Sequence, residues 1–116
     1  MGRRAEDLAH RFLRRNGYTI VARNYRTPSG DGEADLIAWD KDALVIVEVK
    51  SRASEDFGPP ERAIDEVKRL HLVRVARRYA RQSETPWERV RFDSVTVVFE
   101  NPPKIKLYRE VVRRPH

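Results

Sequence analysis

Two carboxylates and a lysine occupy positions where a buried strand does not usually hold charge. Asp35 lies within the apolar run Gly32–Trp39, and Glu48 and Lys50 lie at the end of the apolar run Ala43–Lys50. A charge on a buried strand is costly unless it is paired or binds a metal ion. These three side chains are therefore the first candidates for chemistry.

The two runs are separated by a polar break of hairpin length. A hairpin centred on residues 41–42 pairs Asp35 with Glu48. The same register pairs Glu33 with Lys50. Directly opposed residues share one face of a sheet, with Cβ atoms roughly 5 Å apart. A slip of one residue would move one strand's set to the other face, so the inference depends on this register.

Neighbouring carboxylates repel each other unless they share a proton, meet a cation or bind a divalent metal. The chain has no cysteine and only three histidines, which are not clustered, so Mg²⁺ or Mn²⁺ is favoured over zinc. Lys50, one side-chain step beyond Glu48, is placed to orient a water or to stabilise charge on a phosphate. The alternative is a structural ion-pair cluster, and the apolar flanks favour the metal site.

Asp35 followed by a hairpin and Glu48-Val49-Lys50 resembles the D…(D/E)-x-K signature of restriction-endonuclease-like nucleases. A wider set of motifs, covering nearly the whole chain, resembles the YraN family of small, functionally uncharacterised bacterial proteins. These motifs are Gly2…Ala5-Glu6-Asp7-Leu8-Ala9, Asn16-Gly17-Tyr18, Arg23-Asn24-Tyr25-Arg26, Gly32 to Ala38, Val47-Glu48-Val49-Lys50-Ser51-Arg52, Phe57-Gly58 and Arg91-Phe92-Asp93. One departure is Ala34, which stands where the superfamily usually has proline before its first aspartate.

The resemblance extends to archaeal Holliday junction resolvases and implies a restriction-endonuclease-like core. In resolvase-like relatives a glutamate on the first helix completes the metal site, and Glu6 matches that position. The alternative for Glu6 is a first-turn glutamate that favours the helix dipole. The family also places a polar residue, usually glutamine, at the position of Lys68, which lies in the middle of an apolar helical stripe. Lys68 either points at the acidic site or extends its ammonium group to solvent along its aliphatic stem.

Length and composition predict one domain over residues 1–116. The net charge of +6, with 18 acidic residues retained, suits a protein that binds a polyanion and also holds a cation. The sequence has no apolar run near the 18 or so residues that span a bilayer, and we expect a cytoplasmic protein without a membrane partner.

Hydrophobic periodicity and turn residues predict an α/β protein with a central mixed sheet flanked by helices. The expected elements are a helix over 3–16, strands over 18–25, 33–39 and 43–50, a helix over 61–82, and strands over 91–99 and 105–111. Their order is helix, strand, strand, strand, helix, strand, strand. Asp93 is expected to be a structural ion-pair partner, and Phe57 either packs inward or stacks on a base.

The leading hypothesis is a Mg²⁺- or Mn²⁺-dependent endonuclease-like protein that acts on DNA, branched DNA included. Its assignments are Asp35, Glu48 and Lys50 as catalytic residues, Asp35, Glu48 and Glu6 as metal ligands, and Arg23, Arg52 and Lys68 as phosphate contacts. Cutting both strands of a junction needs two such sites, so a homodimer is expected. The rivals are a non-catalytic nucleic-acid-binding module and an adaptor protein whose acidic cluster is structural.

Overall fold

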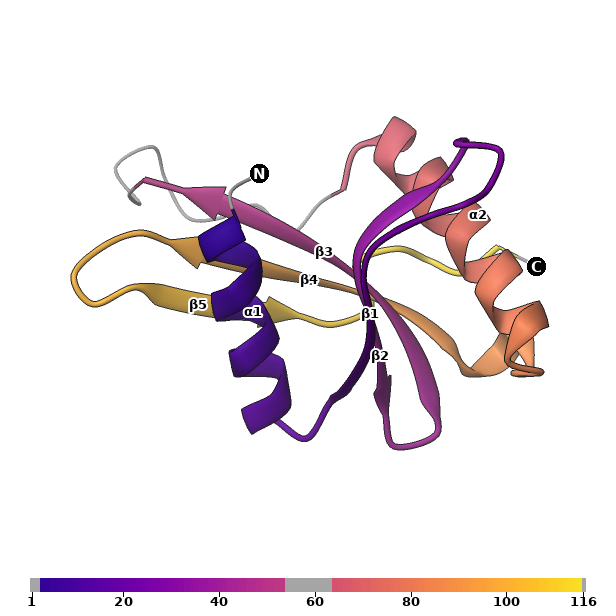
Figure 1. Cartoon of the computed structure of the whole chain (residues 1–116), viewed down its shortest axis with the longest axis horizontal. Coiled ribbons are helices and arrows are strands. Elements are labelled where there is room, and N and C mark those ends of the chain that lie inside the picture. The colour runs from indigo at the N-terminus through magenta and orange to yellow at the C-terminus, as the bar shows by residue number, and fades with distance from the viewer. Residues whose placement is uncertain (1–2, 54–63, 116) are drawn as a thin grey trace.

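The computed structural model describes residues 3–53 and 64–115, and the structural statements that follow concern these residues. Two helices and five strands follow each other in the predicted order (Figure 1). Their bounds are α1 Arg3–Arg15, β1 Thr19–Arg26, β2 Glu33–Asp40, β3 Ala43–Arg52, α2 Glu66–Gln82, β4 Val90–Val98 and β5 Lys104–Tyr108, with a short 3₁₀ helix, Trp87–Arg89, before β4. The mixed α/β prediction is confirmed.

The strands form one five-stranded sheet in the order β1-β2-β3-β4-β5. All neighbouring strands are antiparallel except β3 and β4, which are parallel. A parallel pair cannot be joined by a tight turn and needs a crossover connection, which α2 helps to provide. The sheet is therefore mixed, as predicted.

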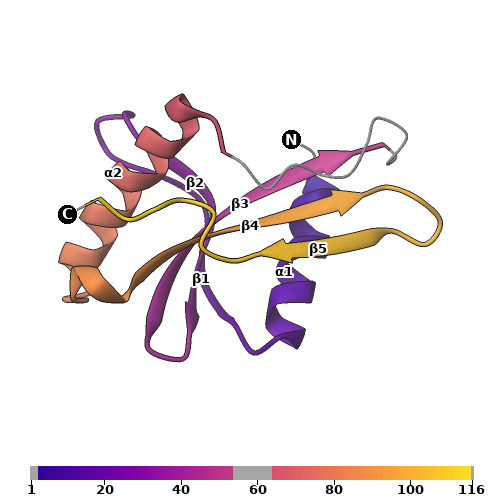
Figure 2. The same ribbon diagram turned by 180° about the vertical axis from the view of Figure 1, so that it is seen from behind.

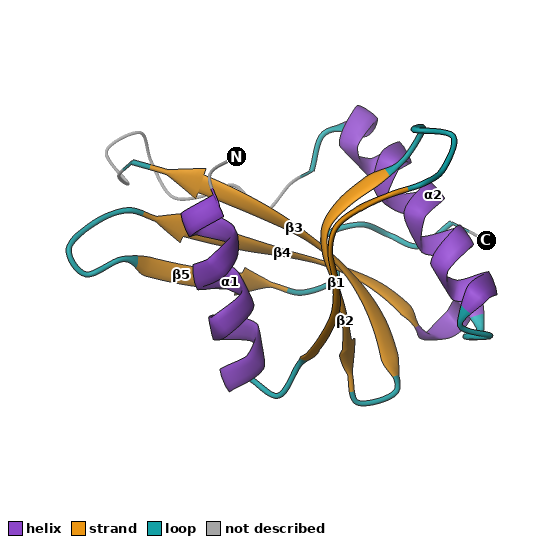
Figure 3. Ribbon diagram, in the orientation of Figure 1, coloured by secondary structure: helices purple, strands orange, loops and turns teal. Residues whose placement is uncertain are grey.

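The two helices cover opposite faces of the twisted sheet (Figures 1 and 3). On one face α2 packs Leu72 and Val75 over Ile46 and the neighbouring strands. On the other face α1 packs Ala9 and Leu13 over the strands that carry Val47 and Val95. Because both faces of β3 are covered, its apolar residues are continuous rather than alternating. Within the two described stretches, neither helix is long and apolar enough to cross a membrane.

The β2–β3 hairpin has the predicted register, from Asp40 opposite Ala43 to Leu36 opposite Val47. Lys41 adopts φ 56° in the turn. Beyond Leu36 the backbone ladder stops, so the pairs predicted for Asp35 with Glu48 and Glu33 with Lys50 are wrong as ladder pairs. The ladder stops because the Val49 N–H donates its hydrogen bond to the Asp35 carboxylate, at 2.7 Å, and not to a backbone carbonyl of β2.

Most element boundaries differ from the predicted ones by one or two residues, and two differ by three or more. Helix α2 begins at Glu66 rather than at residue 61, because Asp65 has extended backbone and its side chain caps the helix by accepting the Lys68 N–H at 3.0 Å. Strand β5 ends at Tyr108 rather than at residue 111. Beyond it the backbone N–H of Glu110 donates to the Asp93 carboxylate at 3.1 Å instead of continuing the ladder. The predicted role of Phe57 falls outside the described residues.

Candidate functional site

Asp35 and Glu48 lie at the end of the β2–β3 hairpin that is remote from its turn. Glu48 follows Ile46 at the period of two, so it lies on the face of the sheet that α2 covers. Glu48 is only 7% exposed, and Asp35 is half-buried. The hairpin thus carries both carboxylates to one end of the sheet and largely removes them from water.

The hydrogen bonding of the two carboxylates is incomplete. Asp35 Oδ2 accepts the Val49 N–H, which fixes its orientation. Glu48 Oε2 is buried and has no hydrogen-bond partner in the described structure. A buried carboxylate oxygen without a partner costs free energy that a bound cation would offset.

Burial raises the pKa of Asp35 above its ordinary value, and the nearby carboxylates of Glu6 and Glu33 raise it further. The Val49 N–H and the Lys68 ammonium group act in the opposite direction. Burial likewise raises the pKa of Glu48, with Asp35 adding to the effect and the ammonium groups of Lys50 and Lys68 opposing it. Two desolvated carboxylates that repel each other fit a hard, oxygen-seeking cation such as Mg²⁺ or Mn²⁺.

A pocket of about 340 Å³ opens beside Asp35. It draws its walls from both helices and from the first three strands: Glu6, Asn24, Tyr25, Arg26, Glu33, Ala34, Asp35, Val49 and Lys68. Lys68 Nζ lies 3.7 Å from Glu33 Oε1 across this pocket. The structure therefore brings Asp35, Glu6 and Lys68 to one pocket, while Glu48 lies buried beside it.

Glu6 is held in an ion pair rather than aimed at the other carboxylates. It is 5% exposed, and its Oε1 accepts from Arg23 Nε at 2.8 Å and from Asn24 Nδ2 at 3.1 Å. Arg23 also donates to Asp7 at 2.6 Å. Among residues 3–53 and 64–115, no three carboxylate or imidazole side chains are grouped closely enough to hold a metal ion. The described geometry thus assembles a carboxylate pair and leaves Glu6 with Arg23.

The other two predicted basic residues lie farther along β3. Lys50 is partly exposed and close enough to Glu48 for its charge to lower the pKa of that carboxyl. Arg52 is the last residue of β3, partly exposed, and does not line the pocket. The sequence argument missed Asn24, which has φ 52° and binds Glu6. Its signal in the sequence is its place in Arg23–Arg26, one of the motifs that carry the family resemblance.

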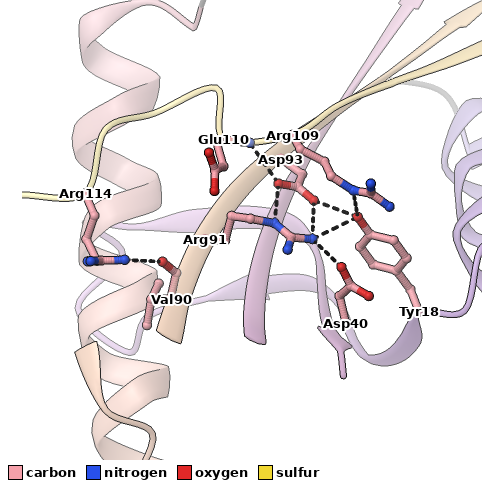
Figure 4. A network of polar contacts seen from close by, with 8 residues as sticks. All are labelled: Tyr18, Asp40, Val90, Arg91, Asp93, Arg109, Glu110 and Arg114. Carbon is pink, nitrogen blue, oxygen red and sulfur yellow. Dashed lines mark hydrogen bonds and ion pairs between the residues drawn. The ribbon is translucent and has the colours of Figure 1, made fainter. Parts of the chain in front are cut away.

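Asp93 is a structural ion-pair partner, as predicted (Figure 4). It is fully buried and receives two hydrogen bonds from Arg91 at 3.0 Å and one from Tyr18 at 2.9 Å. Arg91 also binds Asp40, at the turn end of the hairpin, at 2.8 Å. Arg109 donates to the Tyr18 hydroxyl at 3.1 Å. This network ties β2, β4 and the segment after β5 together.

A larger hollow of about 650 Å³ lies near the turn end of the hairpin, around Asp42, Arg89 and Arg113. None of the sequence-predicted site residues lines it. Its charged side chains are of both signs and are not joined to a buried, unpartnered group among those described. We therefore place the candidate functional site at Asp35 and Glu48 rather than at this larger hollow.

Comparison with known proteins identifies relatives along most of the chain. Residues 5–97 match the uncharacterised protein family UPF0102. A UPF0102 protein of Solibacter usitatus is 55% identical over 108 residues, which cover 93% of this chain and 82% of that protein. A UPF0102 protein of Koribacter versatilis is 49% identical over 111 residues, which cover 93% of this chain and 76% of that protein. A UPF0102 protein of Desulfosudis oleivorans is 47% identical over 96 residues, which cover 83% of this chain and 76% of that protein. The chain therefore belongs to family UPF0102, in agreement with the motifs read from its sequence.

Proposed function

We propose that this protein is a metal-dependent, endonuclease-like protein with a restriction-endonuclease-like core that acts on DNA, including branched DNA. The observation that carries the proposal is Glu48 Oε2, a buried oxygen without a partner, next to the half-buried Asp35. An orphaned carboxylate inside a well-packed sheet is expensive as a purely structural feature. It fits a site whose occupant is a divalent cation.

In this proposal Asp35 and Glu48 hold Mg²⁺ or Mn²⁺, which when bound polarises a phosphodiester oxygen and acidifies a water. Lys50 orients that water or stabilises the charge that develops on the phosphate. Lys68, which lines the pocket, and Arg52, at the end of β3, contact phosphates. The chemistry is hydrolysis of a phosphodiester bond, and cleavage of both strands of a junction requires a homodimer.

Glu6 and Arg23 enter this proposal together, because they are bound to each other. Arg23 contacts a phosphate only if it leaves Glu6, and Glu6 becomes the third metal ligand only if Arg23 leaves. A DNA phosphate that attracts Arg23 would therefore release Glu6 for the cation. Metal binding is consequently expected to be stronger when DNA is present.

A second candidate function is a non-catalytic nucleic-acid-binding module on the same fold. One specific observation favours it: within the described residues the candidate metal ligands number two rather than three. In that case DNA binds with a steep salt dependence, and the carboxylate pair contributes nothing to phosphodiester hydrolysis.

The test is isothermal titration of Mg²⁺ and of Mn²⁺ into the wild type and Asp35→Asn, with and without a four-way DNA junction. We expect wild-type binding that DNA strengthens and that Asp35→Asn abolishes. Cleavage assays of Asp35→Ala and Glu48→Ala should then show lost cleavage with DNA binding intact. Metal binding absent even with the junction, or cleavage unchanged in these variants, would overturn the nuclease proposal.

A further inference from the structure

The side of α1 that faces solvent is rich in arginine. The arginines with exposed side chains are Arg3, Arg4, Arg11, Arg14 and Arg15. One of them, Arg4, lies 5.3 Å from the centre of the Phe99 ring, a contact that leaves its positive charge in place. The two carboxylates of the helix, Glu6 and Asp7, both accept hydrogen bonds from Arg23 of β1. The cations of this surface therefore outnumber its carboxylates.

Arg3 and Arg11 have no close anionic partner. Among residues 3–53 and 64–115, no carboxylate lies within ion-pair distance of either guanidinium group. Both charges act on Asp7 from farther away: the hydrogen bond from Arg23 lowers the pKa of Asp7 most, and the positive charges of Arg3 and Arg11 lower it further. These two guanidinium groups can therefore bind an anionic ligand without first breaking an ion pair within the described fold.

The surface beside these arginines is hollowed. One hollow of about 510 Å³ is lined by Arg3, Arg4, Asp7, Leu8 and Arg11. A second, also of about 510 Å³, is lined by Arg3, Glu6, Asp7, Arg23 and Asn24. The second hollow shares Arg3 and Asp7 with the first, and it shares Glu6 and Asn24 with the pocket beside Asp35. These three adjoining hollows form a path from the Asp35 pocket to Arg11, which we call the α1 groove.

The length of the α1 groove is set by helix geometry. Arg3, Asp7 and Arg11 recur every four residues and so form one row along α1. At about 1.5 Å per residue, Arg3 and Arg11 are separated by about 12 Å along the helix axis. One strand of DNA advances about 3.4 Å per nucleotide, so this row is as long as roughly three or four nucleotides. The groove therefore fits a short stretch of nucleic-acid backbone better than a single small anion.

We propose that Arg3 and Arg11, together with Arg4, bind the phosphate backbone of the DNA strand that continues from the Asp35–Glu48 site along α1. This inference rests on the proposed function and adds α1 as the element that holds the nucleic acid outside the pocket. Charge complementarity selects a polyanion as the occupant, and the planar guanidinium group suits bidentate hydrogen bonds to phosphate. Contacts to phosphates carry no sequence information, so the binding is independent of base sequence.

The experiment measures the affinity of fluorescently labelled DNA, as duplexes of different sequence and as a four-way junction, by anisotropy over a series of KCl concentrations without divalent metal. The variant is Arg3→Gln/Arg11→Gln, and Arg3→Lys/Arg11→Lys is a second variant that keeps the charge. The matched control is Arg78→Gln/Arg81→Gln, which removes the same charge from exposed positions of α2, the helix on the opposite face of the sheet (Figure 2). Circular dichroism checks that all three proteins are folded.

We expect the α1 glutamine variant to bind every duplex and the junction more weakly than the wild type, with the slope of log affinity against log salt reduced by about 1 for each lost phosphate contact. The lysine variant and the α2 control should keep the wild-type slope.

Three results would overturn the assignment of the α1 groove while leaving DNA binding established. They are a wild-type slope in the α1 glutamine variant, an equal loss in the α2 control, and a lysine variant that loses as much slope as the glutamine variant. Wild-type protein that binds no duplex and no junction would instead remove the proposed function itself.

Discussion

Replacement of Glu48 by glutamine distinguishes a metal site from a structural ion-pair cluster. Glu48 is 7% exposed, and burial raises its pKa above the ordinary value of 4.5. Because the folded-state pKa is the higher one, the ionised carboxylate lowers the free energy of unfolding. This cost is absent below the ordinary pKa and develops as pH rises through the folded-state pKa. At neutral pH and without metal, Glu48→Gln should therefore be more stable than the wild type.

The expected gain in stability of Glu48→Gln follows from the buried Glu48 Oε2, which has no hydrogen-bond partner in the described structure. A buried polar group left without a partner costs about 1–3 kcal/mol. The glutamine amide retains part of that cost, so the expected gain is the lower value, about 1 kcal/mol, or roughly 4 °C in Tm for a domain of this size. A metal present at a hundredfold excess over its Kd should stabilise the wild type by about 2.7 kcal/mol and Glu48→Gln far less.

The assay is thermal unfolding of both proteins in a chelator and in excess Mg²⁺ or Mn²⁺. Glu88→Gln is the control, because it makes the same chemical change at an exposed position. A repeat below the ordinary carboxyl pKa of 4.5 should remove the advantage of Glu48→Gln. A lower Tm for Glu48→Gln in the chelator would refute the reasoning, since it would mean that the carboxylate makes favourable contacts within the fold.

Three further outcomes are expected. Arg23→Ala should raise the affinity for Mn²⁺ without DNA, because Glu6 loses its partner and becomes available; an unchanged titration would exclude Glu6 as a ligand. Arg91→Met should lower the free energy of unfolding by about 3–5 kcal/mol in urea, since it removes the main partner of the fully buried Asp93 side chain; a loss below 1 kcal/mol would contradict this. Asp65→Ala should cost about 1 kcal/mol of stability in the same assay by removing the α2 cap, and no change would show that the cap is dispensable.

The hairpin register could be predicted because its information is local. Apolar runs of matching length flank a short polar turn, and the pattern fixes which residues face each other. The end of the ladder could not be predicted in this way. It depends on the Asp35 carboxylate taking the Val49 N–H, a contact that replaces a backbone acceptor with a side chain. Residue type alone does not reveal that exchange.

The candidate site was predicted in its residues and only partly in its arrangement. Asp35, Glu6 and Lys68 do reach one pocket, as the motif pattern suggested. The pairing of Glu6 with Arg23 was missed, because it depends on how α1 packs against β1. The sequence marks Arg23 only as a cation near a strand end, and a cation can meet a carboxylate or a phosphate equally well.

The single parallel contact in the sheet has a consequence for folding kinetics. The β2–β3 hairpin closes across a turn of two residues, whereas β3 meets β4 only when Leu44 finds Val90. Closing that much longer loop costs about 2 kcal/mol more in chain entropy. Contacts of such high sequence separation slow folding, so the rate-limiting step is expected to include docking of β4 on β3. Until β4 arrives, the apolar edge of β3 is open to other strands, and the speed of this closure therefore governs how often newly made chains associate wrongly.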